Sequence, residues 1–128
     1  MSQPLNVLII EDSASDAALM LRHLAKAGFD VSHERVESAD ALREALGRRI
    51  WDVLLCDFTL PGFGAPGALG ILKATGRDIP FIVVSGSIGD ETAIELMRTG
   101  AQDYLMKDNL ARLAPAIERE LAEVRHRH

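Results

Sequence analysis

The stretch WDVLLCDFTLPG, residues 51–62, joins an apolar run directly to a carboxylate. Residues 53–56 favour burial, whereas Asp57, which follows them, favours water or a cation. An apolar run of this length without polar alternation is typical of a strand that is covered on both faces. The stretch therefore predicts a buried strand whose carboxyl end presents Asp57.

Similar short apolar runs alternate with amphipathic stretches along the rest of the chain. The predicted strands are residues 7–10, 31–36, 53–56, 81–84 and 104–106. The predicted helices are residues 13–28, 38–47, 65–76, 89–100 and 108–128. This order predicts an α/β fold with a parallel sheet, helices on both faces and right-handed crossovers. The more polar strand at 31–36 is expected at the edge of the sheet.

Individual residues predict where several helices begin. Ser38 and Asp90 are expected as N-caps of the second and fourth helices, because their side chains can accept hydrogen bonds from free backbone N–H groups. Pro115 falls inside the last amphipathic stretch, so this helix must begin near Ala114 or kink there. Residues 115–128 are then the end of the last helix and a tail or linker.

Composition narrows the class of protein. A chain of 128 residues with 48% hydrophobic and 26% charged residues is expected to form one domain with a single core. The net charge of −5 and the lack of a basic cluster argue against direct nucleic-acid binding. The apolar runs are too short to span a bilayer, the N-terminus does not resemble a secretory signal, and one cysteine fits a reducing compartment. We therefore expect a cytoplasmic domain.

Polar residues that can carry chemistry follow four of the five predicted strands. These residues are Glu11, Asp12, Asp57, Ser85 and Lys107. In open parallel sheets, ligands bind beyond the carboxyl ends of the strands, so these side chains are expected at one edge. Three carboxylates that lie together repel one another unless a cation compensates them. Oxygen ligands favour a hard divalent ion such as Mg²⁺, and the sequence has no His/Cys set for zinc.

The same residues can support phosphoryl transfer. A carboxylate such as Asp57 can act as a nucleophile and form an aspartyl phosphate. Lys107 can supply a positive charge to the phosphoryl group, Ser85 a hydrogen bond, and the metal further charge neutralisation. We therefore expect Asp57 to accept a phosphoryl group.

From the motif VLIIEDS, residues 7–13, to its last helix, the sequence resembles the receiver domains of two-component response regulators. The resemblance implies a single receiver domain over residues 1–128, with a flavodoxin-like, doubly wound sheet of order 2-1-3-4-5 and five helices. It also implies that Asp57 is the phosphoacceptor and that Asp12 binds Mg²⁺ directly. Glu11 would bind the metal through water, and Thr59 would offer its backbone carbonyl.

The resemblance assigns the remaining roles to residues 85–107. Ser85 and Tyr104 match the switch residues, and Lys107 matches the lysine of the phosphorylation site. Two positions depart from the family pattern. Asp108 stands where a proline usually follows the lysine, and Ala65 stands where a glycine is typical, so both the loop before the last helix and the start of the third helix can differ.

The resemblance further implies a phosphorelay function. A histidine kinase or a histidine phosphotransfer protein would donate the phosphoryl group, and the surface of the fourth helix, fifth strand and fifth helix would change its affinity for a downstream partner. Homodimers can form through this face in the family. Such a domain is no enzyme beyond its own phosphorylation and dephosphorylation.

Two other functions remain open at this point. A degenerate receiver would bind partners without phosphorylation, and only the altered loop at Asp108 favours it. A hydrolase with an aspartate nucleophile typically carries a second Asp two residues later, where this sequence has Thr59. Taken alone, Glu11 and Asp12 would be read as acids at a helix start, Lys107 as a surface lysine, and Tyr104 as a core residue.

Overall fold

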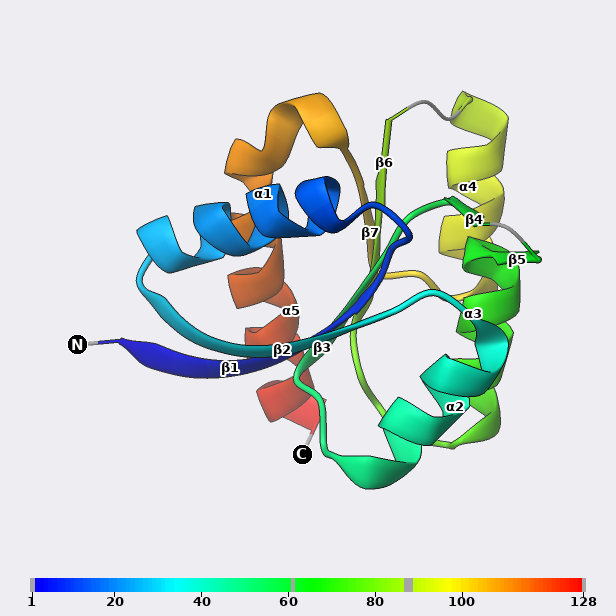
Figure 1. Cartoon of the computed structure of the whole chain (residues 1–128), viewed down its shortest axis with the longest axis horizontal. Helices are drawn as coiled ribbons and strands as arrows, with labels where there is room; N and C mark the ends of the chain where they lie inside the picture. Colours follow the sequence, from blue (N-terminus) through cyan, green and yellow to red (C-terminus); the bar gives the residue numbers. More distant parts are fainter. Residues whose placement is uncertain (1, 61, 87–88, 128) are drawn as a thin grey trace.

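The computed structural model describes residues 2–60, 62–86 and 89–127, and for Thr59 and Asp90 the backbone only. Five parallel strands form one sheet in the order β2-β1-β3-β6-β7 (Figure 1). Their bounds are β1 (Gln3–Ile10), β2 (Phe29–Val36), β3 (Val53–Cys56), β6 (Phe81–Ser85) and β7 (Asp103–Met106). Numbered along the chain within this sheet, the order is 2-1-3-4-5, which confirms the predicted doubly wound fold.

Five α-helices cover the two faces of the sheet. They are α1 (Ala14–Lys26), α2 (Ala39–Arg48), α3 (Ala65–Ala74), α4 (Asp90–Thr99) and α5 (Leu113–Arg127). Helices α1 and α5 lie on one face and α2, α3 and α4 on the other (Figure 1). No helix in the described part of the chain has the length and apolar character that a membrane span needs.

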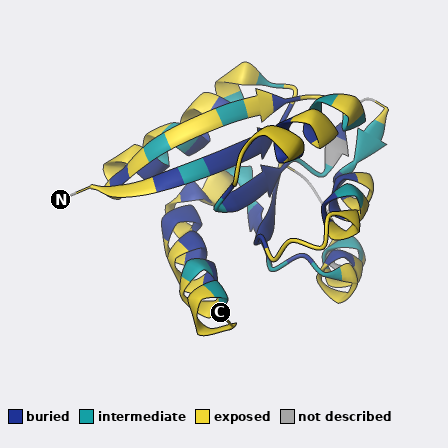
Figure 2. Ribbon diagram, turned by 90° about the horizontal axis from the view of Figure 1, so that it is seen from below, coloured by how far each residue is buried: buried dark blue, intermediate teal, exposed yellow. Residues whose placement is uncertain are grey.

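Alternating side chains of each strand serve the two faces, as the pleat of a strand requires. In β1, Val7 and Ile9 pack with α1 and α5, whereas Leu8 and Ile10 pack with α2 and α3. Both sets are fully buried, which explains why the predicted strands show no polar alternation. Strand β2 exposes most of its polar residues at the edge of the sheet, as predicted (Figure 2).

The register of the strands aligns their carboxyl ends. Ile10 pairs with Cys56 and Cys56 with Val83, so the residues that follow β1 and β3 leave the sheet side by side. The Asp57 backbone N–H donates to the Ile10 carbonyl at 2.9 Å, which extends the ladder by one residue. Pairing within the sheet therefore fixes the backbone positions of Glu11 and Asp57.

Several predicted boundaries were wrong in detail. Strand β1 begins at Gln3 and β2 at Phe29, because the parallel ladder between them pairs polar residues as well as apolar ones. The Pro-Gly pair at residues 61–62 predicts a turn, but the short strands β4 (Thr59–Leu60) and β5 (Phe63–Gly64) on either side of it were not predicted. Of the residues that close this turn, Pro61 lies outside the described part of the chain.

The predicted helix caps have different outcomes. Ser38 is the N-cap of α2, and its hydroxyl accepts a hydrogen bond from the Ala41 N–H at 3.1 Å. The N-cap of α4 is Gly89 and not Asp90, which is instead the first residue of the helix. The prediction for Asp90 was therefore wrong by one residue, because the chain enters this helix through a glycine in extended conformation.

The segments at the two departures from the family pattern are both ordered. Helix α3 begins at Ala65 with Gly64 as N-cap, and a Cβ on Gly64 would lie 2.9 Å from the Phe58 carbonyl oxygen. After β7 the chain forms a 3₁₀ helix, η1 (Lys107–Arg112), in which Asn109 is not helical. Helix α5 then begins at Leu113, so Pro115 falls in its first turn, as predicted.

The two-sided burial of the strands predicts a large difference between two isoleucines. We expect Ile9→Ala to lower the free energy of unfolding by about 2–5 kcal/mol, because Ile9 is fully buried in the central part of the sheet. Ile50→Ala is the matched control, since Ile50 is 82% exposed and should change stability by less than about 0.5 kcal/mol. Urea unfolding measures both, and equal effects would contradict the described core.

Candidate functional site

Three carboxylates gather at the carboxyl ends of β1 and β3. Glu11 and Asp12 follow β1 directly, Asp57 follows β3, and one oxygen from each lies within 4.8 Å of the others. Glu11 is completely buried and the Asp57 side chain is only 13% exposed, whereas Asp12 is exposed to solvent. The acid cluster therefore has a buried floor and an open rim.

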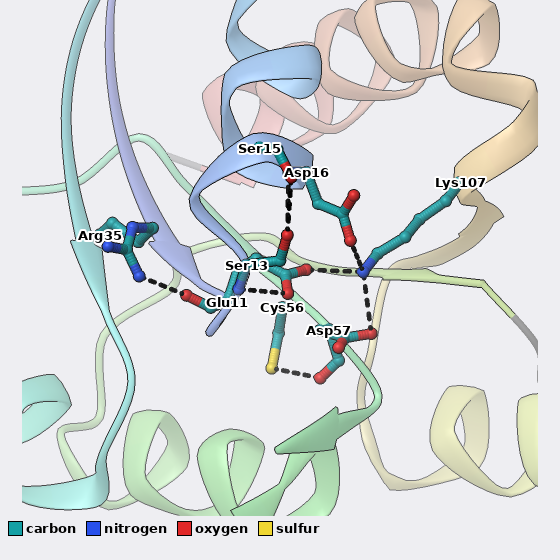
Figure 3. Close-up of polar contacts among 8 residues, drawn as sticks. All are labelled: Glu11, Ser13, Ser15, Asp16, Arg35, Cys56, Asp57 and Lys107. Atoms are coloured by element: carbon teal, nitrogen blue, oxygen red, sulfur yellow. Dashed lines mark hydrogen bonds and ion pairs between the residues drawn. The ribbon is translucent and has the colours of Figure 1, made fainter. Parts of the chain in front are cut away.

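Lys107 brings a single positive charge into this cluster from the end of β7. Its ammonium lies 2.9 Å from Glu11 Oε2 and 3.6 Å from Asp57 Oδ1 (Figure 3). The strand order places β7 two strands away from β3, so the long lysine side chain spans the end of β6 to reach the acids. Lys107 is therefore part of the site and not a surface lysine.

Asp16 also belongs to this site, although no pattern in the sequence predicted it. Its Oδ2 atom lies 2.7 Å from the Lys107 ammonium, which is the shortest of the three carboxylate contacts of this lysine. Asp16 is in the first turn of α1, and its N–H donates to the hydroxyl of the N-cap Ser13. An acid there complements the helix dipole, and this ordinary reading hides a role in the site.

The charges at the site do not balance. Glu11, Asp12, Asp16 and Asp57 carry four negative charges when ionised, and Lys107 carries one positive charge, which leaves an excess of three. Burial raises the pKa of the Glu11 and Asp57 carboxyls, and Lys107 opposes this effect in both. For Lys107, burial acts to lower the pKa, but the ion pairs with Asp16 and Glu11 outweigh it and raise the pKa. The lysine thus stays charged, and the acids still lack a full countercharge.

The two residues predicted as switches lie on the neighbouring strands β6 and β7. Ser85 is the last residue of β6 and is buried, and a Cβ on the following Gly86 would lie 4.0 Å from Lys107 Cδ. Tyr104 is half-buried in β7, packs against the core on the α2–α4 face and donates its hydroxyl to Met106 Sδ at 3.1 Å. Thr59 begins β4, two residues after Asp57, and its side chain lies outside what the structure describes.

The neighbouring Cys56 serves the core. Its side chain is fully buried on the α2–α3 face of the sheet, and its thiol donates to the Asp57 carbonyl oxygen at 3.1 Å. Burial raises the pKa of this thiol, and the charges of Asp57 and Glu11 act in the same direction. Cys56 therefore stays a protonated core residue, as the alternation along the strand predicts.

The donor set fits a small divalent cation. Three carboxylates whose oxygens lie within 4.8 Å of one another offer the hard oxygen ligands that Mg²⁺ requires. Glu11 Oε2 is buried without a hydrogen bond among the described residues and has only its ion-pair contact with Lys107. Exposure of Asp12 at the rim leaves room for the waters that Mg²⁺ keeps. The site is thus suited to a cation together with an anionic group.

Comparison with known proteins gives a consistent family. A model of the response regulator receiver domain matches residues 7–118. The luminescence regulatory protein LuxO of Vibrio campbellii is 36% identical over 99 residues, which are 77% of this chain and 21% of that protein. The transcriptional regulatory protein ZraR of Salmonella typhimurium is 28% identical over 122 residues, or 94% of this chain and 27% of that protein. The chain thus spans about a fifth to a quarter of these relatives.

Solved structures show the same fold. The receiver domain of a putative LuxO repressor protein from Vibrio parahaemolyticus superimposes with a TM-score of 0.85 at 23% identity, over 97% of this chain and 95% of that one. The receiver domain of the sensor histidine kinase PA1611 from Pseudomonas aeruginosa has a TM-score of 0.78 at 21% identity, over 93% and 98%. That structure has a magnesium ion coordinated in its active site cleft.

The raised pKa of Asp57 predicts that the acid cluster costs stability when no metal is bound. A carboxyl whose pKa is raised by folding destabilises the folded state once it is ionised, so the penalty is present at neutral pH. It disappears as the pH falls toward the ordinary value of 3.8, where the group is protonated in both states. We expect Asp57→Asn in metal-free buffer to raise the free energy of unfolding by about 1 kcal/mol at pH 7.

Urea unfolding at pH 7 and at the ordinary carboxyl pKa of 3.8 measures this effect, and the gain in the free energy of unfolding should be smaller at the lower pH. Asp40→Asn is the control, because the Asp40 side chain is 98% exposed and lies in the first turn of α2. A loss of stability in Asp57→Asn at pH 7 would contradict the prediction.

Proposed function

Because this chain belongs to the response regulator receiver domain family, we propose that it accepts a phosphoryl group on Asp57 in a two-component phosphorelay. The family places the chain in two-component signalling, and the proposal concerns the chemistry of its own residues. The observation that carries it is the meeting of Asp57 with Glu11, Asp12 and Lys107 at one edge of the sheet. Such a site holds a nucleophile together with the charges that phosphoryl transfer needs.

The transfer step involves one bond formed and one bond broken. A carboxylate oxygen of Asp57 attacks phosphorus, and the bond from phosphorus to the donor atom breaks with its electron pair leaving on the donor. The donor atom is a histidine nitrogen when a histidine kinase or a phosphotransfer protein supplies the group. Asp57 is partly exposed, with 13% of its side chain accessible, so a donor can approach it from the rim.

We assign the metal ligands as Asp12 and Asp57 directly, the Thr59 backbone carbonyl, and Glu11 through water. Bound Mg²⁺ would neutralise part of the negative charge that the phosphoryl oxygens bring into the site. Lys107 would be the second cationic group of the site, because its ammonium is already 3.6 Å from Asp57 Oδ1. The excess of carboxylates over cations described above supports a need for this metal.

The output is proposed to pass through Ser85 and Tyr104. The buried Ser85 hydroxyl would bond to the phosphoryl group, and Tyr104 would turn inward into the space that this movement frees. A groove of about 520 Å³ lies beside Tyr104, between α4 and β7, so a movement of Tyr104 would change the shape of this surface. Ile94 and Met97 of α4 are 54% and 43% exposed there, which suits a partner or a second copy on the α4-β7-α5 face.

We further propose that residues 1–128 form one receiver domain, with residues 115–128 as the end of its last helix and a tail or linker. It would act in the cytoplasm, without direct nucleic-acid contacts, and catalyse only its own phosphorylation and dephosphorylation. A receiver that works without phosphorylation remains the competing function. The outcome of the following experiment separates the two.

Acetyl phosphate with Mg²⁺ should add one phosphoryl group to the protein, a gain of about 80 Da that follows from the chemistry of the modification. Intact-protein mass spectrometry should show this gain in the wild type and in Asp40→Ala, and its loss in Asp57→Ala. Asp40 is the matched control because it is an exposed aspartate in the first turn of α2 that pairs with Arg43. An unmodified wild type would support the phosphorylation-independent function instead.

Mg²⁺ alone should stabilise the fold, because it binds a site that unfolding destroys. At a concentration ten times its Kd, we expect a gain of about 1.4 kcal/mol in the free energy of unfolding. Asp12→Asn should lose most of this gain, whereas Asp40→Asn should keep it. Thermal unfolding at constant ionic strength, with Na⁺ in place of Mg²⁺ as reference, measures the difference. Equal gains in both variants would argue against the proposed metal ligands.

A further inference from the structure

The Lys107 ammonium is held mainly by Asp16 and Glu11 and not by Asp57. Its distances to their carboxylate oxygens are 2.7 Å and 2.9 Å, whereas its distance to Asp57 Oδ1 is 3.6 Å. An ammonium can donate three hydrogen bonds, but a separation of 3.6 Å is beyond the normal range for one. In this structure the lysine is therefore displaced from the proposed phosphoacceptor toward α1 (Figure 3).

The position of Asp16 is fixed by the start of α1. Its N–H donates to Ser13 Oγ at 3.2 Å, and the Ser13 N–H in turn donates to Glu11 Oε1 at 3.1 Å. Ser13 thus links Asp16 by hydrogen bonds to Glu11, the other acid that contacts Lys107. The helix start presents the Asp16 carboxylate to Lys107 as part of the built site and not as a freely moving surface charge.

The two carboxylates that hold Lys107 differ in how easily they can release it. The Glu11 side chain is 1% exposed, so losing its cation would leave a buried charge unpaired, at a high cost. The Asp16 side chain is 36% exposed, and water can solvate it after the lysine leaves. Asp16 is therefore the partner that Lys107 can exchange.

A phosphoryl group on Asp57 would attract Lys107 away from Asp16. It replaces one negative charge of the carboxylate by about two and adds strong acceptor oxygens. These oxygens would lie beyond Asp57 Oδ1, which is already 3.6 Å from the ammonium. A flexible lysine stem can cover the remaining distance, but the ion pair with Asp16 opposes the movement.

We propose that Asp16 is a positioning residue that holds Lys107 on the α1 side of the pocket until Asp57 carries a phosphoryl group. The inference rests on the proposed phosphorylation of Asp57 and names a further residue that sets its equilibrium. Asp16 stabilises the unphosphorylated arrangement, because Lys107 has to give up the 2.7 Å ion pair to reach the phosphoryl oxygens. Removing the Asp16 charge should favour the phosphorylated arrangement.

Beryllofluoride, a tetrahedral mimic of a phosphoryl group bound to a carboxylate, tests this at saturating Mg²⁺. The chain has three lysines, Lys26, Lys73 and Lys107, so NMR of protein labelled with ¹³C-lysine follows Lys107 directly, with the other two as internal references. We expect Asp16→Asn to bind beryllofluoride about twofold to fivefold more tightly than the wild type, the size expected for one partly exposed ion pair. Asp16→Glu, which keeps the charge, should restore an affinity close to that of the wild type.

Asp40→Asn is the matched control for loss of a first-turn acid. Asp40 also follows a serine N-cap, and it also forms an ion pair, with Arg43 at 3.2 Å, but on α2. This variant should bind beryllofluoride like the wild type. If Asp16→Asn also binds like the wild type, the proposed role of Asp16 is wrong.

A Lys107→Met background separates an effect through Lys107 from simple repulsion between Asp16 and the anion. In this background Asp16→Asn should give no further gain in affinity, and a gain of the same size would overturn the inference. Asp57→Ala reports on the underlying function by itself. A wild type that does not bind beryllofluoride, or an Asp57→Ala variant that does, would count against the phosphoacceptor and not against Asp16.

The Asp16–Lys107 pair can also be tested without any phosphoryl mimic. In metal-free protein, urea unfolding of Asp16→Asn, Lys107→Met and the double variant gives the coupling between the two side chains. We expect a favourable coupling, since the two groups are 2.7 Å apart. Strictly additive effects would overturn the inference even if the phosphorylation of Asp57 were established.

Discussion

Four carboxylates and one ammonium meet at one edge of the sheet, and this imbalance of charge governs the site. Glu11, Asp12, Asp16 and Asp57 cannot all be neutralised by Lys107, and two of them are largely buried. Burial raises the pKa of Glu11 and Asp57, and a neighbouring carboxylate adds a smaller contribution in the same direction. A fold built only for stability would not keep these acids together. The imbalance makes sense for a protein that binds a cation and then exchanges charge at the same place.

The parallel sheet holds the imbalance in place. Each charged residue of the site either follows the end of a strand or, like Asp16, lies in the first turn of the helix after that strand. Backbone hydrogen bonds between the strands align their ends. The ladder is covered by apolar side chains on both faces, so the edge cannot relax to separate the charges. Burial of the apolar core contributes most of the favourable free energy of folding, and it therefore offsets the unfavourable free energy of holding these like charges together.

The position of Lys107 connects the resting site to its proposed change of state. Lys107 contacts a buried, a half-exposed and a nearly buried carboxylate, so a change of charge at Asp57 would alter which of them binds it most strongly. A phosphoryl group would shift that balance, because it offers the lysine a stronger partner. Gly86, which follows Ser85 at the end of β6, is next to the Lys107 side chain, so a movement of this lysine would affect this end of the strand directly. The groove between α4 and β7 is the surface whose shape we expect this shift to change.

The sequence by itself determined the order of strands and helices, because runs such as residues 53–56 have only one way to be buried on both faces. It also brought Glu11, Asp57 and Lys107 to one edge, since parallel strands align their ends. The tertiary structure alone decided that Asp16 belongs to the site, since an acid in a first helical turn looks like ordinary dipole compensation. The pairing of β4 with β5 and the N-cap of α4 were likewise decided by packing and loop geometry, because two-residue strands and a one-residue shift of a helix start leave no periodic pattern in the sequence.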